Sequence, residues 1–157
     1  MKPCLLFKIG PFEFPARLTG QRYAQFIRNE LEDLLENVPL AFRANSWYQH
    51  DGAPPHFSRE VRILLDQRYP QRWIGRGGPH HWPARSPDLT PLDFFLWGHV
   101  KSIVYREPVN TEAELRDRLQ EAFQTVTPDM INNSQASLIR RAQLCVQMNG
   151  RNFEHLL

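Results

Sequence analysis

Three aspartates lie where a carboxylate could bind a divalent metal ion. Asp51 follows a predicted strand at 47–50, and open α/β sheets hold their reactive groups at the carboxyl ends of strands. Asp93 lies in the first turn of a helix that Thr90 is expected to cap, and Asp88 lies in the turn before it. Two-metal phosphoryl transfer clamps the attacking and leaving oxygens between ions about 4 Å apart. Carboxylates on a strand end and on a facing helix could together hold such ions.

Each of these acids also has a purely structural explanation. Asp51-Gly52 is the dipeptide typical of a tight hairpin, although Ala-Pro-Pro at 53–55 does not continue as an alternating strand. Asp93 comes three residues after a threonine, which is capping-box spacing, and Asp88 follows Ser-Pro in a sequence typical of a turn. The local sequence therefore permits a metal site and leaves the structural alternative open.

The other residues that could do chemistry form no comparable pattern. The six histidines include no pair at the spacing of a helical metal site, which disfavours zinc. No serine or cysteine lies in a nucleophile elbow, and no phosphate-binding glycine motif is present. The two cysteines, Cys4 and Cys145, are far apart, which predicts a reducing compartment and no disulfide framework.

Length and composition predict one soluble intracellular domain over residues 1–157. The chain is 41% hydrophobic and 11% aromatic, which is enough to fill a single core. No stretch approaches the roughly 18 consecutive apolar residues that a membrane span needs. The apolar run at 5–7 is too short for a secretory signal. We therefore expect no membrane partner.

Arginines are concentrated in the middle of the chain. Of the 19 basic residues 16 are arginines, and residues 57–87 hold six of them against only Glu60 and Asp66. A guanidinium pairs with phosphate oxygens in a fixed fork, so a basic stripe here predicts contact with a polyanion. A solvated helix face followed by a loop is the alternative that charge alone leaves open.

Hydrophobic spacing and helix caps predict a mixed α/β fold. Apolar residues recur at three- and four-residue steps in several segments, and Ser58, Thr111 and Thr127 lie at N-cap positions. The expected strands are 5–9, 12–14, 47–50 and 73–75. The expected helices are 20–38, 58–69, 91–105 and a C-terminal group within about 111–149, with a proline- and glycine-rich loop at 76–91. The sequence contains no internal repeat and no recognisable domain boundary.

Two segments resemble a known family. Residues 47–56 (WYQHDGAPPH) and 82–98 (WPARSPDLTPLDFFLWG) resemble the second and third acidic motifs of mariner-like DNA transposases. The resemblance covers about residues 5–157 and implies a ribonuclease H-like fold with a mixed sheet and flanking helices. It implies that Asp51 is the second metal-binding acid and Asp93, rather than Asp88, the third, because the family's third acid follows a Ser-Pro-Asp-Leu-x-Pro run by one residue. Their separation of 42 positions fits a longer-spaced subgroup.

The family's first catalytic aspartate has no counterpart in this sequence. In the family it lies on an earlier central strand, but the sole aspartate before Asp51 is Asp33, on a predicted helix. Glu13, in a short predicted strand, has no matching motif. The resemblance therefore implies a C-terminal piece of a catalytic domain, without the first central strand and the helix-turn-helix region. Because two carboxylates make a less ordered site than three, we expect this chain to cut DNA weakly or not at all.

The resemblance also implies a function and its partners. A transposase of this family uses Mg²⁺ or Mn²⁺ in a two-metal site to activate water against a phosphodiester, after which the freed 3′-hydroxyl attacks target DNA. The implied partners are transposon terminal inverted repeats, target DNA and a second copy in a homodimer, in the nucleus. Arg59, Arg62, Arg76 and Arg85 are expected to hold backbone phosphates without reading sequence. The alternative is a non-catalytic nucleic-acid-binding module derived from a transposase.

Overall fold

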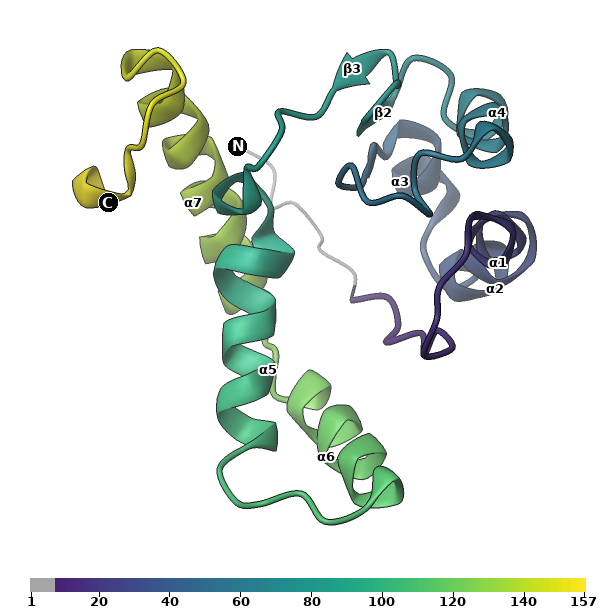
Figure 1. Ribbon diagram of the computed structural model, residues 1–157, viewed down its shortest axis with the longest axis vertical. Coiled ribbons are helices and arrows are strands. Elements are labelled where there is room, and N and C mark those ends of the chain that lie inside the picture. The colour runs from purple at the N-terminus through teal and green to yellow at the C-terminus, as the bar shows by residue number, and fades with distance from the viewer. Residues whose placement is uncertain (1–7) are drawn as a thin grey trace. The chain divides into compact units, whose positions relative to one another are not determined.

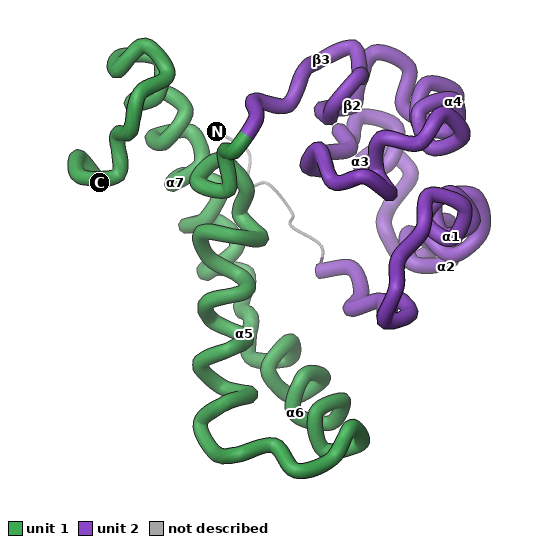
Figure 2. Tube along the Cα trace, in the orientation of Figure 1, with its two compact units in different colours: residues 1–7, 85–157 green, residues 8–84 purple. Residues whose placement is uncertain are grey.

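The computed structural model describes residues 8–157, which form two compact units (Figure 1, Figure 2). Residues 8–84, purple in Figure 2, contain the strands, and we call them the sheet unit. Residues 85–157, green in Figure 2, are helical, and we call them the helical unit. The prediction of a single domain stays a prediction.

The sheet unit begins with one long helical segment. It consists of α1 (Gly20–Gln25), a wider π-helical turn at Phe26–Glu30, and α2 (Leu31–Leu35). The Thr19 hydroxyl oxygen accepts a hydrogen bond from the Arg22 N–H at 3.2 Å, which caps α1. The helix predicted from residue 20 is confirmed, because the apolar residues at three- and four-residue steps are the ones that become buried.

Two more helices follow in the sheet unit. In α4 (Arg59–Arg68), Ser58 caps the first turn as predicted, and Val61 and Leu65 are fully buried against α1. The short helix α3 (Leu40–Asn45) was not predicted. It contains no buried residue, so it carries no apolar periodicity that a sequence could reveal.

Three short parallel strands lie side by side in the order β1-β2-β3. They are β1 (Tyr48–Gln49), β2 (Trp73–Gly75) and β3 (His80–His81), with Tyr48 paired to Trp73 and Ile74 to His80. Helix α4 is the crossover between β1 and β2, as a parallel pair requires. The strands predicted at 47–50 and 73–75 are confirmed. Strand β3 is a difference from the predicted loop, and its two exposed residues explain why no hydrophobic pattern marks it.

The core of the sheet unit is built around Trp73. This side chain is fully buried among residues of α1, α2 and α4, and its Nε1–H donates to the Asp66 carboxylate at 2.9 Å. A Cβ atom on Gly75 would lie 2.4 Å from the His50 ring, and one on Gly78 would lie 2.6 Å from the Trp73 ring. Glycine is therefore needed at both positions because the rings pack directly on the backbone.

The N-terminal strands predicted from sequence are not found. Residues 5–7 of the strand predicted at 5–9 lie outside the described residues, and residues 8 and 9 are not in a strand. The strand predicted at 12–14 is wrong. The rings of Phe12 and Phe14 pack on Phe26 with centroid distances of 4.8 and 5.0 Å, while Glu13 is exposed. The alternation therefore reflects an irregular segment that packs every second side chain on a helix.

The helical unit has a regular succession of elements. They are a 3₁₀ turn at Pro87–Leu89, a π-helical turn at Leu92–Leu96, α5 (Trp97–Val104), α6 (Glu112–Gln124), α7 (Pro128–Gln147) and a last turn at Glu154–Leu156. Val100 and Val104 of α5 pack against Ala122 of α6. The Thr111 and Thr127 caps are confirmed, since their hydroxyl oxygens accept hydrogen bonds from backbone N–H groups three residues later.

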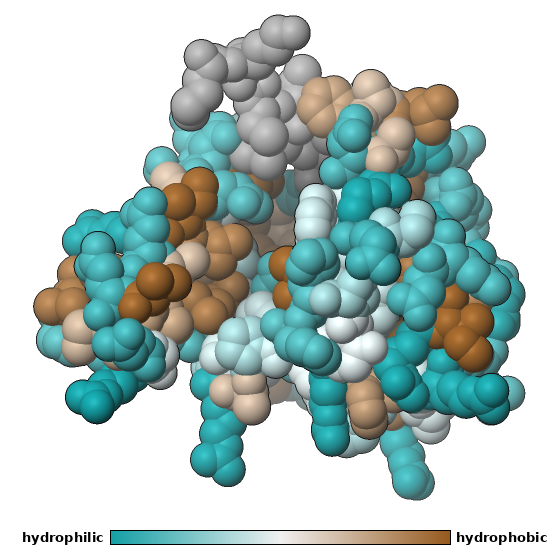
Figure 3. All heavy atoms as spheres, turned by 90° about the horizontal axis from the view of Figure 1, so that it is seen from above, coloured by the Kyte–Doolittle hydropathy of each residue, from teal (hydrophilic) through white to brown (hydrophobic). Residues whose placement is uncertain are grey.

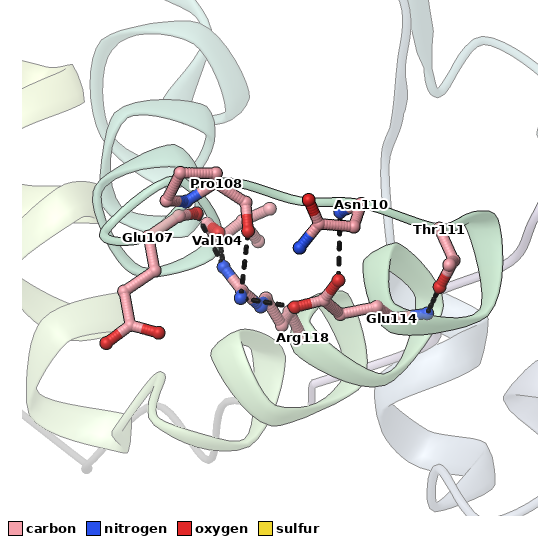
Figure 4. Close-up of polar contacts among 7 residues, drawn as sticks. All are labelled: Val104, Glu107, Pro108, Asn110, Thr111, Glu114 and Arg118. Atoms are coloured by element: carbon pink, nitrogen blue, oxygen red, sulfur yellow. Dashed lines mark hydrogen bonds and ion pairs between the residues drawn. The ribbon is translucent and has the colours of Figure 1, made fainter.

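One arginine anchors the connection between α5 and α6 (Figure 4). The Arg118 guanidinium donates to three backbone carbonyls, at distances of 2.6 to 3.2 Å, and pairs with the Glu114 carboxylate. The carbonyls belong to Val104, Glu107 and Pro108. Glu114 also accepts from the Asn110 N–H at 2.9 Å, while its own N–H donates to Thr111. The predicted Thr111 cap is thus part of a larger set of hydrogen bonds that joins the end of α5 to the start of α6.

The surface mixes polar and apolar side chains. On the face drawn in Figure 3, brown hydrophobic residues lie among teal hydrophilic ones. The large apolar side chains with the highest exposure are Val146, Leu40, Tyr105 and Ile139. Within residues 8–157, every helix is either too short or too polar to cross a bilayer.

Candidate functional site

Asp51 lies in the loop that leaves the carboxyl end of β1 and leads to α4. Its Oδ1 accepts a hydrogen bond from the Ala53 N–H at 2.9 Å and is 2.6 Å from Nδ1 of His56. An ionised carboxylate only accepts hydrogen bonds, so the His56 Nδ1–H is the donor. The Asp51 side chain is 55% exposed and the His56 side chain 20%. A partly buried imidazole therefore holds an accessible carboxylate in one orientation.

The surroundings keep Asp51 ionised. Burial acts to raise the pKa of Asp51, but the hydrogen bonds from Ala53 and His56, with the nearby imidazoles, lower it more, so the pKa lies below its usual value. A carboxylate that stays charged at neutral pH is a suitable oxygen ligand for a hard divalent cation.

Aromatic residues pack around the start of this loop. The rings of His50 and His56 stack with centroids 5.1 Å apart, and the Tyr23 and Tyr48 hydroxyls are hydrogen-bonded at 2.7 Å. Burial, with a smaller effect from His56, lowers the pKa of His50 to about 4, so His50 is neutral at physiological pH. Burial also raises the pKa of Tyr23 to about 12. Tyr23, Tyr48 and His50 are therefore uncharged packing partners at the end of β1.

Two of the predicted arginines lie beside this loop. The Arg62 and Arg76 guanidinium groups are 4.8 and 4.2 Å from the centre of the Phe57 ring. A methyl group on Gly52 would lie 3.6 Å from the Arg76 side chain, so Arg76 lies beside the residue that follows Asp51. Because β1 and β2 are parallel, Asp51 and Arg76 leave the sheet at the same edge. The sheet unit thus brings a carboxylate and two guanidinium groups together.

The remaining predicted arginines have different surroundings. Arg59 is exposed at the start of α4. Arg85 is exposed in the helical unit and has a left-handed backbone, with φ of 58°. By contrast, Arg68 and Arg72 donate to backbone carbonyls within the sheet unit. Part of the positive charge counted in 57–87 therefore has a structural role.

The other two candidate acids lie in the helical unit. Asp93 is exposed in the first turn of the segment Leu92–Leu96, as predicted, but the predicted Thr90 cap is wrong, because Pro91 is the N-cap residue and no described side chain caps this segment. Asp88 is in the preceding 3₁₀ turn, and its carbonyl accepts a hydrogen bond from Arg141 at 3.3 Å. Within residues 8–157, no group of three histidine, cysteine or acidic side chains is close enough to hold a metal ion. The convergence of Asp51 and Asp93 on one metal site stays a prediction.

Two residues of the loop were missed by the sequence interpretation. The histidine spacing excludes His56 from a helical zinc pair and predicts no other role for it. Phe57 belongs to no motif. The available signal was position, since both come within six residues of Asp51 in the turn that leads to a capped helix. The contacts of His56 with Asp51 and of Phe57 with the two arginines form because the chain turns back toward β1. No local periodicity predicts such a turn.

Curated relatives of the chain include a histone-lysine N-methyltransferase and several transposases. This chain is 27% identical over 139 residues to human histone-lysine N-methyltransferase SETMAR, covering 87% of this chain and 19% of that protein. It is also 27% identical over 124 residues to the Tcb2 transposase of Caenorhabditis briggsae, covering 76% of this chain and 42% of that protein. The chain therefore spans less than half the length of either relative. No protein-family model matches it.

Solved structures share the fold. The Mos1 transposase catalytic domain, solved with Raltegravir and Mn, superposes with a TM-score of 0.74 and 24% identity, over 88% of this chain and 66% of that one. The Mos1 paired-end complex with the left transposon end gives a TM-score of 0.70 and 26% identity, over 88% and 38% of the two chains. The predicted ribonuclease H-like fold class is confirmed. Homologues of this chain include mariner/Tc1 transposases and SETMAR, and its structure matches part of the Mos1 mariner transposase catalytic domain.

Proposed function

We propose that this chain is part of a transposase catalytic domain that cleaves phosphodiester bonds at transposon ends and joins the freed 3′-hydroxyl to target DNA. The observation that carries the proposal is the fold shared with the Mos1 catalytic domain over 88% of the chain. In this fold Asp51 follows a parallel strand, at the sheet edge where α/β proteins place their reactive groups.

The donor chemistry fits Mg²⁺ or Mn²⁺. Both ions prefer carboxylate oxygens, and Asp51 offers an ionised, accessible carboxylate that a second residue holds in place. Asp93, exposed on the first turn of its helix, is the proposed second ligand, with Asp88 as the alternative. When bound, the ions polarise the phosphodiester and lower the pKa of the attacking water. Mos1 catalytic-domain structures have been solved with Mn and with Mg.

The arginines of the chain bind and orient DNA in this proposal. Arg62 and Arg76 hold backbone phosphates next to Asp51, while Arg59 and Arg85 add exposed contacts elsewhere. The Mos1 paired-end complexes support DNA as the partner. The proposed assembly is a homodimer on transposon terminal inverted repeats and target DNA, in the nucleus.

The chain on its own is proposed to cleave DNA weakly or not at all. It covers 66% of the Mos1 catalytic domain, and residues 8–157 contain no group of three metal-binding side chains. Two carboxylates hold a pair of ions less firmly than three, so in-line placement of the phosphate suffers. The same observation supports the second candidate function, a nucleic-acid-binding module without catalysis.

Mn²⁺ binding tests the proposed metal ligands. We expect Asp51→Asn and Asp93→Asn each to weaken Mn²⁺ binding at least about tenfold, or about 1.4 kcal/mol, because each removes a charged ligand. Free Mn²⁺ can be followed by electron paramagnetic resonance during a titration. The matched control is Asp88→Asn, which removes the same charge five residues before Asp93 and should leave the affinity unchanged.

Each outcome of that titration has a definite meaning. Unchanged Mn²⁺ affinity in the Asp51→Asn chain would contradict the metal site. Loss in Asp88→Asn but not in Asp93→Asn would move the second ligand to Asp88. Efficient Mn²⁺-dependent nicking that Asp51→Ala abolishes would overturn the proposed weakness of the chain. Salt-sensitive DNA binding without any Mn²⁺ binding would favour the binding module.

His56 should tune the metal affinity through Asp51. We expect His56→Ala to weaken Mn²⁺ binding about tenfold, because residues that orient a metal ligand typically contribute that much to affinity. His56→Asn should retain most of the affinity, since its amide N–H can replace the Nδ1–H that donates to Asp51 at 2.6 Å. The same Mn²⁺ titration measures both variants. Equal losses in the two variants would show that the hydrogen bond to Asp51 does not matter.

A further inference from the structure

A second basic site lies at the opposite edge of the sheet unit from Asp51. A pocket of about 230 Å³ opens between α2, α3 and the end of α4. Its charged lining consists of three arginines and one acid, which are Arg43, Arg68, Arg72 and Glu32. The remaining lining residues are Leu35, Leu40, Ala44, Ser46 and Tyr69. The lining of the pocket therefore carries three positive charges and one negative charge.

The hydrogen bonds of the three arginines differ. Arg72 donates to the carbonyls of Ala44 and Ser46, which satisfies the end of α3. Arg68 donates to the Ile27 carbonyl and pairs with Glu32. These two guanidinium groups are therefore held in fixed positions by the fold, and both residues line the same pocket.

Arg43 has the least complete set of partners. Its contact with the Glu32 carboxylate is long, at 3.5 Å, and its Nε is buried without a hydrogen-bond partner in the described part of the chain. This orphaned Nε shows that the contacts of the fold leave the hydrogen-bonding capacity of Arg43 incomplete. The Arg43 side chain as a whole is 28% exposed and lines the pocket, so its accessible part is available to a ligand.

The position of the pocket separates it from the Asp51 loop. Ser46 and Arg72 precede β1 and β2, whereas Asp51 and Arg76 follow them, and the two strands are parallel. Five residues of extended chain from Ser46 to Asp51 span roughly 16 Å. One phosphate cannot contact both edges, so the pocket is a separate site.

We propose that this pocket binds a phosphate group of a nucleic-acid backbone. Guanidinium groups match phosphate oxygens in a forked geometry, and three arginines line the pocket, two of them held in place by backbone carbonyls. The choice of nucleic acid as the source of the phosphate rests on the proposed function. The site gives the chain a backbone contact that is independent of the metal-binding edge.

Two substitutions with opposite predicted effects test the site. Arg43→Gln removes a donor and should weaken binding of inorganic phosphate at least about fivefold, while Glu32→Gln removes the competing negative charge and should strengthen it about threefold. Glu32 pairs with Arg43 and Arg68, so Glu32→Gln is expected to lower the stability of the fold. If that loss of stability were the main effect, phosphate binding would weaken and would not strengthen. The arginine Nε–H resonances in ¹H–¹⁵N spectra of the full chain report phosphate binding. Arg28→Gln, at an ion pair on the surface, is the control of equal charge.

Duplex DNA in a second titration identifies the source of the phosphate. We expect Arg43→Gln to lower the slope of log affinity against log salt by about 0.9, as the loss of one phosphate contact does. Phosphate binding with unchanged DNA affinity would overturn the nucleic-acid assignment. Equal phosphate affinity in Arg43→Gln and Arg28→Gln would overturn the site itself. Mn²⁺ titration of Arg43→Gln should match that of the unaltered chain, so failure of the metal proposal is a distinguishable result.

Discussion

Replacing Trp73 with alanine is expected to lower the free energy of unfolding by about 3–5 kcal/mol, a large share of the stability of an ordinary domain. The Trp73 side chain is fully buried at the centre of the sheet-unit core. Gly75 and Gly78 are so close to the ring and to its neighbour His50 that the surrounding backbone is built around its shape. Alanine would leave a large cavity and an Asp66 carboxylate without its hydrogen-bond donor.

Urea unfolding followed by circular dichroism measures this loss. The matched control is Trp47→Ala, because Trp47 belongs to the same unit but is 53% exposed, and its removal should cost less than about 1 kcal/mol. Trp73→Phe should fall between the two, since it keeps an aromatic ring but loses the bond to Asp66. A Trp73→Ala chain that unfolds at the same urea concentration as Trp47→Ala would contradict the described core.

The confirmed elements are those with a strong local signal. Helices α1, α4, α6 and α7 each begin at a serine or threonine whose side chain accepts a backbone hydrogen bond, and strands β1 and β2 are flanked by turn residues. Caps and periodicity act over a few residues, so a sequence reveals them. Neither signal depends on a tertiary contact.

The elements that were missed carry no local apolar pattern, and the strand that was wrongly predicted carries a misleading one. Helix α3 buries no residue, and β3 is a two-residue strand that pairs only because β2 lies beside it. In the opposite case, Phe12 and Phe14 alternate like a strand but pack on a helix. Alternation reports which side chains are buried and does not report what buries them.

The acids of the candidate site could be predicted from the sequence. The residues that contact and orient Asp51 were harder to predict. Asp51 follows β1 as expected, because a strand with a turn after it is visible in sequence. The hydrogen bond from His56 and the approach of Arg76 to Gly52 depend on the return of the chain after β1 and β2. The count of six arginines in 57–87 could not separate those that donate to backbone carbonyls of the fold, such as Arg68, from those that make no such bond within the described residues, such as Arg76.

Removing both arginines beside the Asp51 loop should weaken DNA binding strongly. We expect the double variant Arg62→Gln/Arg76→Gln to bind duplex DNA about a hundredfold less tightly at low salt, at about 1.4 kcal/mol for each lost charge-assisted contact. The slope of log affinity against log salt should fall by about 1.8, because two phosphate contacts are lost. Fluorescence anisotropy over a series of salt concentrations measures both quantities. The fold should survive, since each guanidinium contributes only a cation–π contact to Phe57 of about 0.5–1 kcal/mol.

The control must remove the same charge from the same unit. Arg17→Gln/Arg28→Gln does so at two exposed positions, one of which is paired with Glu60. If binding depended only on net charge, both double variants would lose the same affinity, and the assignment of phosphates to Arg62 and Arg76 would be wrong. If Arg62 and Arg76 contact phosphates specifically, the Arg17→Gln/Arg28→Gln control keeps most of its affinity for duplex DNA. The two arginines then place a phosphate next to the carboxylate of Asp51, because Arg76 lies against Gly52.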